Sequence, residues 1–356
     1  MKKVSIIWLN YNSMRFIDLA LRSLRSIFDL DYEDFEVIIV DNASSDGSFE
    51  VIKEFVDKFR SGYRVKVIRS DKNRGYSGGM NLGFAHVDSN SKYVAFLNND
   101  LVVEPQSLSA MVERIESNEG VAAASGLVFY GDGETIYSAG GVVTELGNAG
   151  GVCWMLKLSE CHSASKQHYV TYADGAYTVA RVDAIKEVGY LGKPFLDEAF
   201  LYFDDYILGL LLWNRGYRVV YYPVKAGLHY AHKTIKTGIS YYGVRAHIAL
   251  MKILRTRLTS LTNLHIMRRL AIHSELCLFG KSESCYLIRA VYDGLKLASL
   301  ARKRIGQLIL YRAPYVKSCL DELKCHILGL CKGLLKITHN NIMFQERDRD
   351  IYNRLQ

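Results

Sequence analysis

The first 127 residues alternate between short apolar runs and longer segments whose apolar residues recur at helical spacing. Apolar runs at residues 4–9, 35–40, 65–69 and 93–97 predict four buried strands. The segments after them predict helices at about residues 12–28, 45–59 and 106–118, and a further helix that follows a glycine-rich loop and ends at about residue 87. Because strands and helices alternate, we expect an α/β fold with a Rossmann-like, mostly parallel sheet and helices on both faces.

The rest of the chain follows two further patterns. Residues 128–240 are rich in glycine and aromatic residues, and they predict helices at 182–188 and 205–214 and a strand at 218–222 that ends at Pro223. From about residue 240 the pattern is helical, including one apolar stripe over 316–337. We therefore expect a domain over 1–240, with halves at 1–127 and 128–240, and a basic amphipathic helical extension over 241–356.

Charge separates the extension from the domain. The net charge is +8, but residues 1–230 carry 23 Lys and Arg against 29 Asp and Glu, whereas residues 231–356 carry 22 against 8. Basic residues interleaved with apolar helix positions favour an anionic membrane surface as the partner of the extension. A solvated bundle that forms a homodimer or packs on the domain is the alternative. We expect no nucleic acid, because no recognised reading motif accompanies the charge.

Two absences bear on location. No apolar run reaches about 18 residues, so we expect no transmembrane helix, and the N-terminal apolar run is too short for a signal peptide. The cysteine count is odd and the sequence contains no Cys-x-x-Cys pair. This pattern predicts unpaired cysteines in a reduced, cytosolic protein.

Polar residues follow several of the predicted strands. In an open α/β sheet, ligands bind outside the carboxyl ends of the strands. Asp41 can there accept hydrogen bonds from a nucleobase, and Tyr11 can stack on it, whereas Asp46 is expected only to cap a helix. The glycine-rich segment 73–83 could approach a phosphate, although it matches neither dinucleotide-binding nor P-loop patterns.

The polar tip Asn98-Asn99-Asp100 lies between two apolar runs. A buried carboxylate is costly unless it is paired or bound to a cation. Asn98 and Asp100 lie on the same side of the chain, and oxygen ligands at this spacing suit Mg²⁺ or Mn²⁺. The alternative is a tight turn, in which Asn and Asp are common.

In this order, the motifs resemble those of family 2 glycosyltransferases, which are inverting nucleotide-sugar enzymes with the GT-A fold. The resemblance looks strongest to the rhamnosyltransferase-like branch. It rests on four segments of residues 1–100: 10–12 (Asn-Tyr-Asn), 40–47 (Val-Asp-Asn-Ala-Ser-Ser-Asp-Gly), 73–83 (Asn-Arg-Gly to Asn-Leu-Gly) and 97–100 (Leu-Asn-Asn-Asp). Beyond them, 174–176 (Asp-Gly-Ala) and the stretch 196–223 continue the likeness to about residue 250.

The resemblance implies a role for each matching residue. Asp205 is expected to be the general base, with Asp204 beside it, and Asp100 and His229 are expected to bind the metal. The resemblance makes residues 1–127 the nucleotide-sugar half and residues 128–240 the acceptor half of the catalytic domain, with Asp174 and Gly175 on the acceptor side. The donor is expected to contact Asn10, Tyr11, Asp41, Arg74, Gly75 and Asn98. For His229 the alternative is an ordinary core or surface histidine.

The implied activity is metal-assisted, inverting transfer of a sugar from a nucleotide-diphosphate donor to a hydroxyl of a glycan or lipid-linked acceptor, with Mg²⁺ or Mn²⁺ as the cofactor. The implied location is the cytoplasm, peripheral to the cytosolic face of a membrane. Which sugar, nucleotide and acceptor are used stays open.

Two departures from the family pattern keep an alternative open. Ile207 and Leu211 stand where the family usually has an acid and an arginine, so a non-catalytic nucleotide- or glycan-binding relative is the second hypothesis. The third is a sugar-phosphate nucleotidyltransferase. That class expects a glycine-rich, basic loop after the first strand, and residues 10–14 (Asn-Tyr-Asn-Ser-Met) do not fit it.

Overall fold

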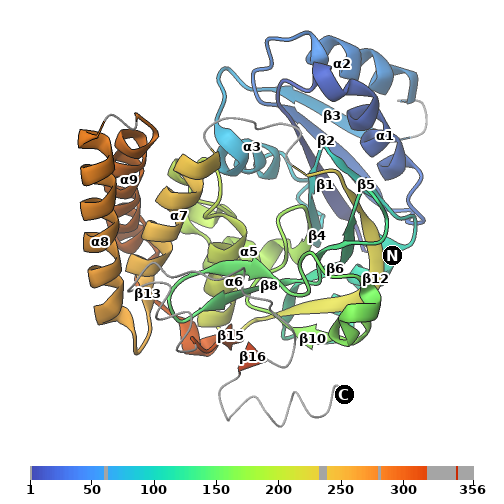
Figure 1. Cartoon of the computed structure of the whole chain (residues 1–356). Helices are drawn as coiled ribbons and strands as arrows, with labels where there is room; N and C mark the ends of the chain where they lie inside the picture. Colours follow the sequence, from blue (N-terminus) through green and yellow to red (C-terminus); the bar gives the residue numbers. More distant parts are fainter. Residues whose placement is uncertain (1, 60–62, 232–238, 280–281, 319–341, 344–356) are drawn as a thin grey trace.

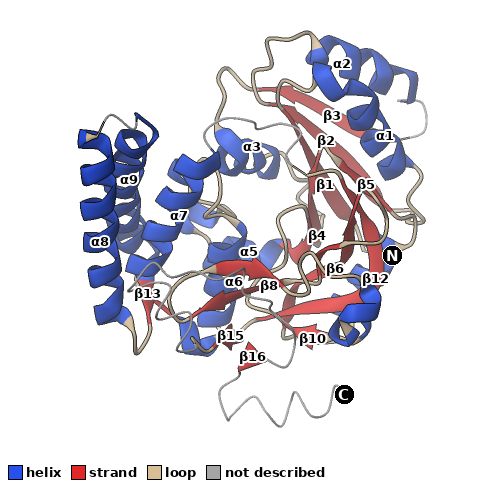
Figure 2. Cartoon of the chain, in the orientation of Figure 1, coloured by secondary structure: helices blue, strands red, loops and turns tan. Residues whose placement is uncertain are grey.

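The structure is a computed structural model that describes residues 2–59, 63–231, 239–279, 282–318 and 342–343. In this part of the chain a ten-stranded sheet runs through the centre (Figures 1 and 2). Its main path is β10-β12-β6-β11-β4-β1-β2-β3, with β5 paired to β12 and β7 to β6. The strands are β1 (Val4–Asn10), β2 (Phe35–Asp41), β3 (Arg64–Arg69), β4 (Tyr93–Asn98), β5 (Leu101–Val103), β6 (Val121–Tyr130), β7 (Ile136–Ser138), β10 (His168–Tyr169), β11 (Tyr177–Arg181) and β12 (Arg218–His229).

The first half of the sheet is parallel, as predicted, whereas the second half is mixed, with β12 parallel to β6. Strands β1 to β4 pair in parallel, but β11 runs antiparallel to both β4 and β6. The strand expected at 218–222 does not end at Pro223 and continues to His229. The register against β6 shifts between Tyr221 and Lys225, and such an irregularity tolerates a residue without a backbone donor.

The predicted helices of the domain are present. They are α1 (Ile17–Phe28), α2 (Ser48–Phe59), α3 (Gly75–Phe84), α4 (Ser107–Glu116), α5 (Val182–Val188) and α6 (Asp205–Asn214). Figure 1 shows α1 and α2 on one side of the sheet and α3 on the other, as the alternating pattern predicts.

Helix α3 packs unusually close to the sheet because of its glycines. A Cβ at Gly79 would lie 2.5 Å from Cδ1 of Leu9, and one at Gly83 would lie 2.4 Å from Cγ2 of Ile7. These glycines are four residues apart and therefore share one face of the helix. The glycine pattern of segment 73–83 thus serves helix–sheet packing.

The extension is helical at first and then returns to the domain. It contains α7 (Ile239–Ile253), α8 (Thr259–Leu278) and α9 (Ser282–Ile305), with β13 (Leu254–Arg255) paired to β14 (Leu308–Ile309). After α9, β15 (Tyr315–Val316) joins a second sheet with β8 (Gly141–Thr144), β9 (Ala149–Gly151) and β16 (Ile342–Met343). Most of the apolar stripe expected at 316–337 lies outside the described residues. No helix within the described ranges is both long and apolar enough to cross a membrane.

The prediction that all cysteines are unpaired is wrong for four of them. Cys153 is bonded to Cys161 and Cys277 to Cys285. Both pairs are separated by eight residues, a spacing that carries no metal or redox motif and that gave no sequence signal.

Candidate active site

The carboxyl ends of β1, β2 and β4 bring three of the predicted residues together. In the register of the sheet Asn10 lies opposite Asp41, and Leu9 lies opposite Asn98. Asn10 is fully buried. Its Nδ2 donates to Oδ1 of Asp41 at 2.9 Å, and its Oδ1 accepts from Oγ of Ser13 at 2.6 Å. Asn10 therefore ties the strand ends together, a contact that strand order alone does not reveal.

Asp41 lies in the same network and is almost fully buried. Its Oδ2 accepts a hydrogen bond from the backbone N–H of Ser44 at 3.0 Å and lies 3.5 Å from Nε of Arg69. The carboxylate thus shapes the turn after β2. Asp46 accepts from the N–H of Ser48 at 3.0 Å, at the start of α2, in accord with its expected capping role.

Tyr11 borders an open cavity at the end of β1. The cavity has a volume of about 570 Å³, and its other lining residues are Asn12, Met14, Arg15 and Asp46. Its wall is thus an aromatic side chain beside polar groups, which is a setting suited to a planar heterocycle.

The start of α3 is already occupied by protein groups. The N–H of Gly75 donates to Oδ1 of Asn73 at 2.8 Å, and the N–H of Ser77 donates to the carbonyl of Phe200 at 3.4 Å. A Cβ at Gly75 would lie 2.2 Å from that same carbonyl oxygen. Arg74 turns away and pairs with Asp71 at 2.5 Å. In this arrangement the helix N-terminus offers no open phosphate cradle of the kind the glycines suggested.

Asp100 and His229 lie side by side because β5 pairs with β12. Leu101 is opposite His229 in that antiparallel pair. Nε2 of His229 lies 3.0 Å from Oδ1 of Asp100 and 3.4 Å from Nδ2 of Asn98. Both Asp100 and His229 are less than 5% exposed. The predicted pair is thus brought together from positions 129 residues apart.

This pair fits part of a divalent-cation site. Adjacent octahedral ligands at about 2.1 Å from an ion lie about 3.0 Å apart, which matches the separation of the His229 and Asp100 donor atoms. Nδ1 of His229 is buried without a hydrogen-bond partner in the described part of the chain. No group of three or more His, Cys, Asp or Glu gathers among the described residues. Mg²⁺ characteristically takes one or two carboxylates and completes its shell with phosphates and water.

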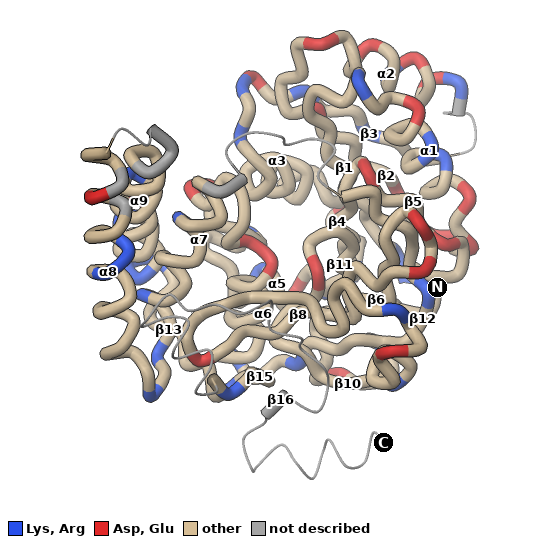
Figure 3. The backbone as a smooth tube through the Cα atoms, viewed as in Figure 1, with Lys and Arg blue, Asp and Glu red and all other residues tan. Residues whose placement is uncertain are grey.

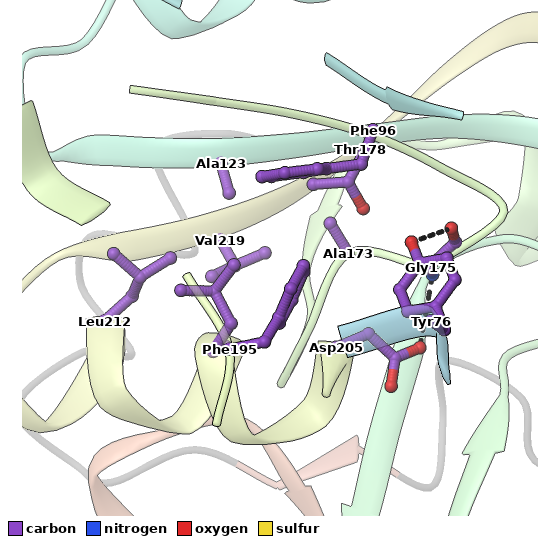
Figure 4. Close-up of a pocket in the computed structure, with 12 residues that line it drawn as sticks. Tyr76, Phe96, Ala123, Ala173, Gly175, Thr178, Phe195, Asp205, Leu212 and Val219 are labelled. Atoms are coloured by element: carbon purple, nitrogen blue, oxygen red, sulfur yellow. Dashed lines mark hydrogen bonds between the residues drawn. The ribbon is translucent and has the colours of Figure 1, made fainter. Parts of the chain in front are cut away.

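Asp204 and Asp205 begin helix α6. Asp204 is the N-cap, and its Oδ1 accepts from the N–H of Asp205 at 3.1 Å. Asp205 accepts from the N–H of Gly175 at 3.1 Å and from the N–H of Tyr206 at 2.8 Å. Each Asp205 oxygen retains a second lone pair, and the side chain lines a cavity beside Tyr76 and Gly175 (Figure 4).

The same surroundings raise the pKa of both carboxyls. Burial raises the pKa of Asp204 to about 6, and the negative charge of Asp174 adds to the rise. Burial also raises the pKa of Asp205 well above its ordinary value, with further contributions from the charges of Asp204 and Asp174. Because three acids share one region, the pair holds a proton more tightly than isolated carboxyls do. In Figure 3 acidic segments lie near β11, close to the centre of the molecule.

Asp174 lies between the Asp100–His229 pair and the Asp204–Asp205 pair. Its Oδ1 accepts from the N–H of Ala176 at 2.9 Å, and burial raises its pKa while His229 opposes the rise. Gly175 carries the N–H that Asp205 accepts, and its carbonyl accepts from the hydroxyl of Tyr76 at 2.7 Å. The two predicted acceptor-side residues thus lie beside Asp205.

Tyr137 is a residue of this site that sequence reasoning missed. Its ring meets the His229 ring edge-on, with centroids 4.3 Å apart. Burial raises its pKa far above the ordinary value, and the carboxylates of Asp174, Asp205 and Asp100 each add to the rise. Tyr137 therefore lies within electrostatic range of both the metal-side and base-side acids. It lies in β7, and no family motif marks it.

The two departures in α6 have a structural reason. Every residue from Tyr206 to Trp213 is buried, including Ile207 and Leu211. Helix α6 packs against β8, β14 and η6 (Leu310–Arg312), so its outer face is covered by the extension. An acid and an arginine at these positions would be buried, and burying charged side chains is costly. The apolar Ile207 and Leu211 avoid that cost.

The extension also contacts the loop that precedes Asp204. Arg245, on α7, donates from Nη2 to the carbonyl of Ala199 at 3.0 Å and also to that of Glu198. The ring of Tyr242 stacks on Phe200 with centroids 5.1 Å apart. Phe200 has a left-handed φ of +62°, so a strained backbone is held by α7 on one side and by α3 on the other.

Two curated relatives cover parts of the chain. A segment of 138 residues is 32% identical to an uncharacterised glycosyltransferase of Nostoc sp. (strain PCC 7120), covering 38% of this chain and 40% of that protein. A segment of 176 residues is 24% identical to the poly-beta-1,6-N-acetyl-D-glucosamine synthase of Staphylococcus epidermidis, covering 49% of this chain and 39% of the synthase. The matches therefore span about two fifths of the length of each relative.

Two solved structures share the fold. The mannosyltransferase PcManGT from Pyrobaculum calidifontis, in complex with GDP-Man and Mn²⁺, aligns with a TM-score of 0.51 at 16% identity and covers 84% of this chain and 75% of its own. GalNAc-T7 with UDP, GalNAc and Mn²⁺ aligns with a TM-score of 0.57 at 12% identity, covering 86% and 59%. At these identities the likeness establishes the GT-A fold alone.

The sequence pattern of the glycosyl transferase family 2 domain matches residues 5–189, which is more than half of the chain. This match, together with the GT-A fold and the named relatives, establishes that the protein belongs to glycosyl transferase family 2.

Proposed function

We propose that the protein is an inverting glycosyltransferase that moves a hexose or deoxyhexose from a nucleotide-diphosphate donor to a hydroxyl of a glycan or lipid-linked acceptor. The observation that carries the proposal is a short chain of hydrogen bonds between the two groups of residues. The N–H of Gly175 donates to Asp205, and the next residue, Ala176, accepts from the N–H of Asn98, whose Nδ2 lies 3.4 Å from Nε2 of His229. One small region thus contains a candidate base and a candidate metal pair, the two functions that such a transfer requires.

Asp205 is proposed as the general base. The acceptor oxygen forms a bond to the anomeric carbon, its proton passes to the Asp205 carboxylate, and the bond from that carbon to the diphosphate oxygen breaks. A raised pKa suits this role, because a base is most effective when its pKa approaches the working pH. Asp204 is better suited to position Asp205, since hydrogen bonds from Ser77 and the Asp205 N–H engage both of its oxygens.

A divalent cation, Mg²⁺ or Mn²⁺, is proposed at Asp100 and His229, with Asn98 beside them. When bound, the ion neutralises charge on the departing nucleoside diphosphate. Both aligned enzyme structures contain Mn²⁺, which supports the choice of cofactor for this chain. The protein groups themselves hold the strand ends in place and exclude water through burial.

The open cavity at Tyr11 is proposed to accept the nucleobase. Tyr11 provides a ring for stacking, and Asp41 lies one strand away in the Asn10 network. Arg74 and Gly75 lie on the adjoining loop, where Arg74 could exchange Asp71 for a donor phosphate.

A location on a membrane surface is part of the proposal, whereas the two disulfides give no support to the cytoplasmic side that the sequence predicts. Seven large apolar side chains of α8, α9 and the turn after α8 are more than a third exposed: Leu264, Met267, Ile272, Leu278, Phe279, Tyr286 and Tyr292. The exposed Arg302 and Lys303 lie at the end of α9. Arg257 and Arg304, however, pair with Glu145 and Glu198, so part of the basic character is used within the chain.

The function is tested with purified protein and a panel of UDP-, GDP- and dTDP-sugars. We expect one nucleotide to raise the melting temperature when Mn²⁺ is present and the matching sugar nucleotide to be slowly hydrolysed. The products should have inverted anomeric configuration by NMR. Retention of configuration would contradict the inverting mechanism, and nucleotide binding without any turnover or transfer would favour a non-catalytic relative.

A further inference from the structure

We propose that Trp154, together with Tyr130, is the platform on which a pyranose ring of the acceptor stacks. The inference rests on the proposed function and concerns a surface that no motif assigns. Trp154 lies in the loop after β9 and is 38% exposed. Trp8 and Trp213, the other two tryptophans, are buried in the core.

A row of aromatic side chains connects Trp154 to the candidate site. The Trp154 ring nitrogen donates to the hydroxyl of Tyr130 at 2.8 Å. The Tyr130 ring meets Tyr137 edge-on with centroids 5.2 Å apart, and Tyr137 in turn meets His229. The row therefore leads, through three successive contacts, from an exposed tryptophan to the proposed metal ligand.

The backbone around Trp154 is strained and fastened. Cys153 and Met155 flank it with left-handed φ angles of +59° and +61°. Such an angle is strained for a non-glycine residue and persists only where neighbouring contacts enforce it. Here the Cys153–Cys161 disulfide and a hydrogen bond from the Met155 N–H to the carbonyl of Ile136, at 2.9 Å, enforce it. The position of the exposed Trp154 side chain is therefore fixed by its backbone, unlike that of a loosely packed surface residue.

The chemistry of the surface suits a sugar. A pyranose presents a face of C–H groups and a rim of hydroxyls, and an aromatic ring beside hydrogen-bonding groups is complementary to both. The hydroxyl of Tyr130, which accepts the hydrogen bond from Trp154, is such a group, and it lies between Trp154 and the site in the aromatic row. A ring stacked on Trp154 would therefore have polar groups on the side that faces the site.

The position of the row favours the acceptor over the donor. Gly141, three residues after β7, exchanges backbone hydrogen bonds with Tyr172, and Gly175, three residues further on, donates its N–H to Asp205, the proposed base that takes its proton from the acceptor. The open cavity at Tyr11 lies instead at the end of β1, in the nucleotide half. Trp154 and Tyr130 belong to the 128–240 half, so they are placed to set which acceptor sugar is used.

The test uses the full chain and a panel of methyl glycosides of glucose, galactose, mannose, rhamnose and N-acetylglucosamine, followed by saturation-transfer NMR. We expect at least one glycoside to bind the wild type, and Trp154→Ala to weaken it roughly tenfold. Trp154→Phe should retain part of the binding. Leu158→Ala, an exposed apolar residue of the same region, is the matched control and should leave it unchanged.

A second arm separates this proposal from the proposed function. Donor-dependent thermal stabilisation with Mn²⁺ and acceptor-free donor hydrolysis are measured on the same proteins, and Trp154→Ala should match the wild type in both. Equal glycoside binding by Trp154→Ala and wild type, or no binding of any glycoside, would overturn the platform while leaving the donor results intact. Absence of every donor signal in the wild type would instead count against the proposed function.

Discussion

The hydroxyl of Ser77 donates a hydrogen bond to Oδ2 of Asp204 across 3.3 Å and 127 residues of sequence. A helix packed on the first half of the sheet thereby holds a carboxylate of the second half. Burial and the nearby Asp174 charge raise the pKa of that carboxyl to about 6. The contact is present although the ionised form of Asp204 is disfavoured, and this conflict has measurable consequences.

Asp204→Asn should stabilise the protein at neutral pH. The folded-state pKa of about 6 lies above the ordinary value of 3.8, so the folded state binds the proton more tightly. The Asp204 carboxyl therefore costs no stability below about pH 4, and its cost grows between about pH 4 and pH 6 and stays constant above that, where both the folded and the unfolded state are ionised. Asparagine also caps helices well. We expect a gain of roughly 1–3 kcal/mol in the free energy of unfolding at pH 7.5, measured by urea denaturation without metal, and none at pH 4. A gain that did not change with pH would contradict this origin.

The same substitution should move the pH profile of activity. The charge of Asp204 contributes to the raised pKa of Asp205. In the wild type we expect kcat to rise with pH along an acid limb well above pH 4, because Asp205 must lose its proton to act as a base. In Asp204→Asn that limb should shift to lower pH. An unchanged limb would show that Asp205 is not the group that titrates.

Asp205→Asn should abolish transfer while donor binding remains. Loss of a general base lowers kcat by about 10²–10⁴-fold, whereas the proposed nucleotide cavity is at the end of β1. The measurement is initial transfer rate alongside donor-induced thermal stabilisation. Glu54→Gln, an exposed acid of α2 that pairs with Lys58, is the matched control and should behave as wild type. Undiminished transfer by Asp205→Asn would refute the base assignment.

Much of this region could be predicted from sequence, but not how it is held together. Asp205 and His229 were located through resemblance, and the strand ends through apolar periodicity. Asn10, expected at the donor, is instead a buried hydrogen-bonding centre, because the identity of its partners depends on strand register. Tyr137 and the two disulfides gave no local signal, since each depends on contacts made only after folding.

Replacing His229 should weaken metal dependence specifically. With Asp100 as the remaining ligand, His229→Ala should need roughly 10–100-fold more Mn²⁺ for half-maximal activity, and excess metal should restore part of the rate. Asp100→Ala should lose more, because it removes the charged ligand. His86→Ala, an exposed histidine after α3, is the control. Identical Mn²⁺ titrations for His229→Ala and wild type would contradict metal binding at this pair.

The close packing of α3 predicts opposite effects for two glycine substitutions. Gly79→Ala places a methyl group 2.5 Å from Leu9 and should destabilise the protein by about 1–3 kcal/mol. Gly243→Ala, in α7, meets no atom within 4 Å and should stabilise it by up to about 1 kcal/mol. Urea denaturation of the two variants measures this difference. Similar stability of both variants would mean that α3 can move off the sheet.

Vesicle binding tests the proposed membrane surface. The full chain should sediment with vesicles containing phosphatidylglycerol, and binding should fall as salt increases. Replacing Leu278 and Phe279 by serine should reduce it, because both side chains are more than three quarters exposed. Leu191→Ser, at an equally exposed leucine of the domain, is the control. Equal sedimentation of all three proteins, or none, would contradict this role of the α8 end.

The hydrogen bonds from Arg245 to the carbonyls of Glu198 and Ala199 connect the extension directly to the loop before the proposed base. A partner that displaced α7 would break these hydrogen bonds, and thermodynamic reciprocity would then require the site to influence binding of that partner equally. If a bilayer that binds α8 and α9 shifts α7, occupancy of the sugar-transfer site must change the affinity for that bilayer by the same factor. Membrane binding and substrate binding would then be coupled, so that measuring either one would report on the position of α7.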